Sequence, residues 1–203
     1  TNEALYLQAA LLLGLGFAIW LAVFPFYTWV PMLTDEVPAY VSGFTLSLLT
    51  TVVLFYSLDF LNEYAWLRTA RLLPQVLQVT GAMMIATGGI WTAFQPKLSR
   101  ALGYAFILQT GISLLAVSLQ SEAGLSVFAA SLLPRLLAIW LWALVISILV
   151  RRGITPTLMG VRGLFRLSPL PAVGLGAAWL SLAGLPLLGI YPVRQVLIEG
   201  LAQ

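Results

Sequence analysis

Six apolar stretches, each long enough to cross a lipid bilayer, make up most of this chain. They cover residues 4–30, 37–60, 73–94, 98–119, 124–150 and 171–197. A membrane-spanning helix needs about 20 mainly apolar residues, so each stretch predicts one such helix. Of the 203 residues, 61% are hydrophobic and only 8% are charged, which excludes an ordinary soluble fold. The sequence therefore predicts an all-α, multi-pass membrane bundle in which residues 1–203 form a single domain.

The composition also excludes several kinds of chemistry. The chain has no cysteine and no histidine, so thiolate or imidazole metal ligands and a Ser/His/Asp set are absent. The glycine motifs at residues 14–16 and 174–177 lie inside apolar stretches, where they indicate helix packing and not phosphate binding. The net charge of +3 comes mainly from basic loop residues, which favours bilayer orientation over nucleic-acid binding. We expect no catalytic residue, metal or cofactor in this chain.

Basic residues gather in alternate loops. The third and fifth loops contain Lys97, Arg100, Arg151, Arg152, Arg162 and Arg166. The acidic first loop, with Asp35 and Glu36, is expected on that side, and the opposite side has only Arg68 and Arg71. By the positive-inside rule the third and fifth loops face the cytoplasm, which puts the N-terminus outside. The fifth loop either lies flat at the membrane interface or is a solvated loop that orients the protein.

Two arginines fall inside the predicted spans. A charged group in the membrane is costly, so Arg135 and Arg194 are candidates for a functional site. Arg135 is either a structural group, paired with an acid or with carbonyls freed at Pro134, or part of an ion path. Arg194 either extends toward the interface or has a role in such a path.

Prolines also interrupt the apolar stretches, at Pro25, Pro134, Pro186 and Pro192. Broken helices within a membrane are tolerated where the freed backbone is buried in protein or lines a wet cavity, as in transporters.

Three motifs give the chain a resemblance to a known family. The run FPFYTWVPMLTDEVPAYVSGFTLSLL, followed by QPKLSRALGYAFILQTGISLLAV and LSLAGLPLLGIYPVRQV, resembles the antiporter-like subunits of respiratory complex I. Subunits of Mrp cation antiporters and membrane-bound hydrogenases are similar. The motifs occur in the family's order, and the resemblance implies that this chain corresponds to the family's seventh to twelfth transmembrane helices. Pro25 would then mark the family's broken seventh helix, and the domain would be partial relative to the family.

The family's titratable residues are replaced in this chain. The resemblance puts the lysine of the seventh helix at Trp20, and that of the eighth at Thr51, or at Thr50 in the alternative alignment. Two motif histidines are replaced, one by Tyr27 and the other by Gln109. The family's lysine or glutamate of the twelfth helix corresponds to Arg194, and its lysine of the eleventh helix to Arg135.

A guanidinium does not release its proton in a working cycle, so a lysine relay cannot run through this chain. Tyr27, Thr51 and Gln109, with water, remain candidates for a passive hydrogen-bonded path.

The resemblance implies a structural or coupling subunit of a complex I-like assembly, an NADH- or ferredoxin:quinone oxidoreductase, with other membrane-arm subunits and the lipid bilayer as partners. One alternative is a cation-translocating subunit that uses Arg135 and Arg194 as fixed charges. Another is a membrane assembly or anchoring protein. A bacterial inner membrane or a thylakoid membrane is the expected location.

Overall fold

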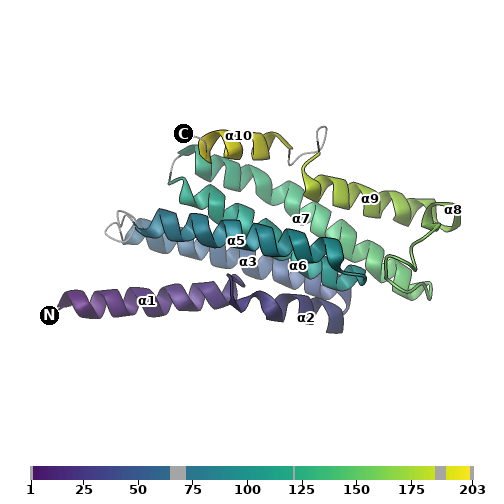
Figure 1. The fold of residues 1–203 in the computed structure, drawn as a ribbon, viewed down its shortest axis with the longest axis horizontal. Helices are drawn as coiled ribbons and strands as arrows, with labels where there is room; N and C mark the ends of the chain where they lie inside the picture. Colours follow the sequence, from purple (N-terminus) through teal and green to yellow (C-terminus); the bar gives the residue numbers. More distant parts are fainter. Residues whose placement is uncertain (1, 65–71, 121, 186–190, 202–203) are drawn as a thin grey trace.

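The structure is a computed structural model that describes residues 2–64, 72–120, 122–185 and 191–201, and these residues form a helical bundle (Figure 1). A 3₁₀ turn, Phe26–Thr28, precedes α2. The helices are α1 (Asn2–Trp20), α2 (Trp29–Glu36), α3 (Ala39–Glu63), α5 (Leu72–Phe94), α6 (Leu98–Ser118), α7 (Glu122–Arg151), α8 (Leu164–Leu167), α9 (Pro169–Ala183) and α10 (Tyr191–Leu201). No strand occurs in these residues, which confirms the all-α prediction. Among them α3, α5, α6 and most of α7 are each long and apolar enough to cross a membrane.

The helix α6 is the centre of the bundle. Most of its side chains are buried, and it packs against α2, α5 and α7. Figure 1 shows these helices side by side along the long axis of the molecule, with α1 at the lower edge. Because α6 is enclosed on several sides, polar side chains on it are placed among other helices and not in lipid.

Glycines allow α5 and α6 to approach closely. A Cβ at Gly111 would lie 2.7 Å from the carbonyl oxygen of Gly81, and one at Gly88 would lie 2.7 Å from the amide nitrogen of Leu108. Small residues at helix interfaces serve this purpose in membranes, where backbone contact replaces the hydrophobic driving force. The two backbones are therefore fixed against each other along this seam.

The first apolar stretch is broken, as the sequence predicted, but the break begins before Pro25. The helix α1 ends at Trp20, Ala22 has a φ of +54°, and the Phe24–Pro25 peptide bond is cis. The indole nitrogen of Trp29 donates to the carbonyl oxygen of Ile19 at 3.2 Å. The same oxygen also accepts from the Ala22 nitrogen at 3.2 Å, so this carbonyl near the C-terminal end of α1 has two donors from beyond the helix.

The sixth stretch is divided between α9 and α10, which follow one another along the same side of α7 (Figure 1). Gly184 ends α9 in the left-handed conformation, with a φ of +70°. Pro186 lies outside the described residues, and Pro192 is the second residue of α10. A proline near a helix start is compatible with the helix, because its missing N–H group has no helical partner there.

The expected break at Pro134 was wrong. The helix α7 continues through Pro134 for its full 30 residues. Proline removes one backbone hydrogen bond, but neighbouring helices can support the chain at that place. Here α7 packs against α3, α6 and α9.

The first, third and fifth loops lie at one end of the bundle, as predicted. Asp35 accepts from Lys97 Nζ at 3.1 Å and from Arg100 Nε at 2.8 Å. The third and fifth loops are joined by two backbone bonds, from the Leu98 nitrogen to the Pro156 oxygen and from the Leu158 nitrogen to the Pro96 oxygen, each 2.9 Å long. The arginines expected at the opposite end, Arg68 and Arg71, lie outside the described residues.

Candidate functional site: a polar network between two arginines

Arg135 is one end of a buried polar network. Its side chain is 4% exposed, and its Nη1 atom donates to Ser113 Oγ and, at 3.5 Å, to the backbone oxygen of Gln109. Both partners belong to α6, so the expected carbonyls freed at Pro134 are not its partners. No acid forms a salt bridge with Arg135 within the described residues. The guanidinium is therefore solvated by a hydroxyl and a carbonyl dipole.

Arg194 is the other end of the network. Its Nη1 atom donates to the backbone oxygen of Ala183 at 2.7 Å, and its Nη2 atom donates to that of Leu182. These carbonyls belong to the last turn of α9, where helical donors are missing and the helix dipole is negative. The guanidinium therefore caps α9 and does not extend freely to the interface.

Gly184 makes room for this cap. A Cβ on Gly184 would lie 2.7 Å from Arg194 Cδ and 2.9 Å from Nη1. The residue that ends α9 in a left-handed turn is thus also the residue over which the arginine side chain passes. A larger residue in place of Gly184 would therefore be strained by the positive φ and would also collide with the Arg194 side chain.

Gln109 connects the two arginines. Its Nε2 atom donates to the Leu182 oxygen at 3.2 Å, so this carbonyl accepts from both Gln109 and Arg194. Ser113, one turn further along α6, donates to the Gln109 backbone oxygen at 3.1 Å and accepts from Arg135. A continuous series of hydrogen bonds therefore runs from α7 through α6 to the junction of α9 and α10.

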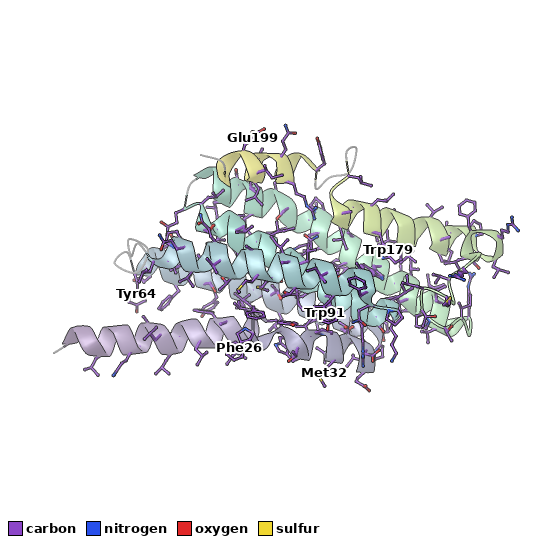
Figure 2. The ribbon with its side chains drawn as sticks, viewed as in Figure 1. Phe26, Met32, Tyr64, Trp91, Trp179 and Glu199 are labelled. Atoms are coloured by element: carbon purple, nitrogen blue, oxygen red, sulfur yellow. The ribbon has the colours of Figure 1, made fainter. Side chains whose placement is uncertain are left out.

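A cavity of about 360 Å³ borders this network on the side of the charged loops. Gln109, Leu182, Trp142 and Trp179 are among its lining residues. The two tryptophans pack edge to face with ring centroids 5.6 Å apart, and Figure 2 shows Trp179 on α9. Their indole nitrogens are buried and have no hydrogen-bond partner among the described residues. The cavity is mainly apolar. Among the α6 residues that line it, Gln109 is polar and lies furthest from the charged loops.

The other predicted site residues are not part of this network. Tyr27 stacks on Phe24, and its ring centroid is 6.5 Å from that of Tyr104. Thr51 Oγ1 on α3 is buried without a hydrogen-bond partner in the described part of the chain. The side chain of Trp20, at the end of α1, is 55% exposed. Within the described residues no hydrogen bond joins Tyr27, Thr51 and Gln109 directly, so the candidate passive path through these side chains would need water between them.

Thr51 nevertheless lies near the level of Arg135. The helices α3 and α7 are in contact at two aromatic pairs, Phe44 with Trp140 and Phe55 with Phe128. Thr51 lies between the two α3 members of these pairs, and Arg135 lies between the two α7 members. The helices are antiparallel, so the threonine and the arginine occupy the same central part of the bundle.

The network can hold helices together, but it is not a continuous chain of groups that pass protons. Two of its links are backbone carbonyls, which accept hydrogen bonds without exchanging protons, and its charged members are guanidinium groups. Sequence reasoning identified Arg135, Gln109 and Arg194 but missed Ser113 and the carbonyls of Leu182 and Ala183. The spacing of Gln109 and Ser113, four residues apart on one helix face, was the available signal.

The fold and the network define an integral membrane protein whose helices are interrupted within apolar stretches and joined by one buried and one half-buried arginine. A family model described as "NADH:quinone oxidoreductase/Mrp antiporter, TM" matches residues 1–203, and the chain belongs to this family.

Curated relatives match most of the chain. "NADH-quinone oxidoreductase subunit N 1" of Herpetosiphon aurantiacus is 33% identical over 180 residues, which are 86% of this chain and 35% of the relative. "NADH-quinone oxidoreductase subunit N 2" of Solidesulfovibrio magneticus is 29% identical over 175 residues, 84% of this chain and 36% of the relative. The chain thus spans about a third of the length of these relatives.

Proposed function

We propose that residues 1–203 form a single antiporter-like domain in a membrane-arm subunit of a complex I-like oxidoreductase, with a structural or coupling role and a degenerate proton channel. The membrane would be a bacterial inner membrane or a thylakoid membrane, and the partners would be other membrane-arm subunits and lipid. The observation that carries the proposal is the double use of the Leu182 carbonyl by Gln109 and Arg194. It supports a joint that holds α9 and α10 to α6.

The positions at which the family resemblance implies lysines support the degenerate channel. Trp20 and Thr51 have no titratable amine, and the chain's single lysine, Lys97, is paired with Asp35 at the loop end. A buried ammonium can be brought near neutral pKa and can then exchange its proton, whereas a guanidinium remains charged. Arg135 and Arg194 are therefore suited to fixed charges and to holding carbonyls.

The alternative of a cation-translocating subunit uses the same arginines to shape an ion path. Two fixed positive charges oppose cation entry unless an acid compensates them. No described acid pairs with either arginine, so this alternative requires carboxylates from another chain. The observed contacts favour the structural joint.

Purification from the native membrane tests the proposed function. A tagged form of the subunit, extracted in mild detergent and analysed by mass spectrometry, should carry along other membrane-arm subunits and the iron–sulfur subunits of a quinone-reducing enzyme. Recovery of the tagged subunit alone, from membranes in which the enzyme remains intact, would instead support an independent anchoring or assembly protein.

A further inference from the structure

The fifth loop and the start of α9, residues 151–170, form a surface that we call the basic hairpin. Backbone bonds from Leu98 and Leu158 tie it to the third loop. Its Leu164 side chain is buried in the core, 4% exposed. These contacts attach the basic hairpin to the third loop and to the core, and α8 lies at the end of α9 (Figure 1).

The outer surface of the basic hairpin carries two kinds of side chain. Its arginines are all exposed: Arg151, Arg152, Arg162 and Arg166. Large apolar side chains lie among them and are also exposed: Met159, Phe165, Leu167 and Leu170, at 70%, 67%, 75% and 84%. Arginine interspersed with exposed Phe and Leu at the end of a membrane bundle is typical of a segment that lies in the lipid interface.

No ion pair within the described part of the chain compensates the positive charge on the basic hairpin. Residues 123–198 contain no Asp or Glu, and no salt bridge to these four arginines occurs within the described residues. Of the two acids in the first loop at this end, Asp35 is occupied by Lys97 and Arg100. The excess of positive charge favours an anionic partner.

Arg152 adds a second, independent feature. Its Nη1 atom donates to Ser168 Oγ, and Ser168 is the residue that precedes the first turn of α9. A cation is thereby held at the positive end of a helix dipole, an arrangement that an anion would stabilise. Arg166 is exposed in the last turn of α8, two residues before Ser168 in the chain, and adds a second positive charge to this part of the basic hairpin.

We propose that the basic hairpin binds the phosphate group of an anionic phospholipid through Arg152 and Arg166. Phe165, Leu167 and Leu170 then lie at the boundary between headgroups and acyl chains. A lipid satisfies both features of the surface at once, because its phosphate matches the arginines and its tails match the exposed apolar side chains.

The test uses the full chain, reconstituted in phosphatidylcholine vesicles that contain a minor fraction of phosphatidylglycerol. After mild extraction, native mass spectrometry counts the phosphatidylglycerol molecules that stay bound. Each arginine near an anionic lipid contributes enough that its loss should weaken retention about fivefold, and the pair Arg152→Gln and Arg166→Gln about 25-fold. The matched control is Arg152→Lys with Arg166→Lys, which should retain the lipid because charge is preserved.

Other outcomes overturn the proposal. Unchanged phosphatidylglycerol retention in the glutamine variant shows that these arginines do not bind it. Equal loss in the lysine and glutamine variants assigns the effect to the Arg152–Ser168 contact and not to charge. Unchanged retention together with loss of the glutamine variant from its native complex assigns the surface to an acidic protein partner.

Discussion

Gln109 and Arg194 donate hydrogen bonds to the same acceptor, the backbone oxygen of Leu182 in the last turn of α9. Gln109 belongs to the central helix α6, and Arg194 belongs to α10 beyond the break. A single carbonyl of α9 therefore binds side chains of α6 and α10, in addition to the packing of α9 and α10 on α7.

This shared acceptor predicts non-additive stability. In Gln109→Leu the Leu182 oxygen keeps Arg194, and in Arg194→Met it keeps Gln109, but in the double variant it is left unpaired. The double variant should lose roughly 1–2 kcal/mol more unfolding free energy than the sum of the single variants. Unfolding of the reconstituted chain by a denaturing detergent measures this. Arg194→Met combined with Asp35→Asn, at the distant loop end, is the control pair and should be additive; strict additivity in both pairs would argue against the joint.

We expect the loss of Ser113 to destabilise the chain more than the loss of the charged residue Arg135. Ser113→Ala leaves a buried guanidinium without its hydroxyl acceptor and should lower the unfolding free energy by about 2–4 kcal/mol. Arg135→Met removes the buried charge, and Ser113 still donates to the Gln109 oxygen, so its cost should be below about 1 kcal/mol. Adding Arg135→Met to Ser113→Ala should restore stability. A larger loss for Arg135→Met than for Ser113→Ala would indicate a further anionic partner for the arginine.

Asp35 predicts an acid dependence of stability. Burial raises the pKa of this carboxyl, whose side chain is 8% exposed, but its bonds to Lys97 and Arg100 outweigh burial and hold the pKa below its ordinary value. A carboxyl with a lowered folded-state pKa contributes stability above its unfolded pKa of about 4 and loses it as the pH falls through the lower folded value.

The measurement for Asp35 is thermal stability as a function of pH. The wild type should lose stability below about pH 4, and Asp35→Asn should start lower and lack this component. A matching acid-dependent loss in Asp35→Asn would assign the effect to another carboxyl.

We expect alanine substitutions at two adjacent glycines of α5, Gly88 and Gly89, to change stability in opposite directions. A Cβ at Gly88 would lie 2.7 Å from the Leu108 nitrogen and 2.8 Å from the Tyr104 oxygen, both backbone atoms, whereas one at Gly89 would meet Leu108 Cδ1 at 3.5 Å. Gly88→Ala should destabilise the chain by about 1–3 kcal/mol through separation of α5 and α6. Gly89→Ala should be neutral or stabilising by up to about 1 kcal/mol, because alanine favours the helix. Equal effects in the same unfolding assay would show that the seam can adjust.

The sequence predicted the all-α fold and a break near Pro25, because apolar length and proline position are local signals. Of the other three prolines, Pro134 does not break its helix, Pro186 lies outside the described residues, and Pro192 is the second residue of α10. The first stretch is broken near Pro25 as expected, since the chain there turns between α1 and α2. Pro134 shows the limit of this reasoning. Whether a proline breaks a helix depends on the surrounding helices, and those contacts come from residues far away in the chain.

The candidate site was only partly predictable. Charge within apolar stretches identified Arg135 and Arg194, and both are members of the network. Their acceptors were not predictable, since the carbonyls of Leu182 and Ala183 are backbone groups that every residue has. Tyr27 and Thr51 were proposed by alignment to the family, which carries no information on whether replaced side chains still contact one another.

If the network is a structural joint, this part of the chain does not relay protons through titratable side chains. The test is the proton-to-electron ratio of the proposed complex I-like assembly, purified and placed in proteoliposomes, measured with its electron-transfer rate for wild type, Gln109→Leu and Thr51→Val. Thr51→Val removes a buried hydroxyl that has no partner in the described residues. Both variants should keep the wild-type ratio. A lower ratio in either variant, with complex yield and electron transfer intact, would contradict it and show that protons pass through this part of the chain.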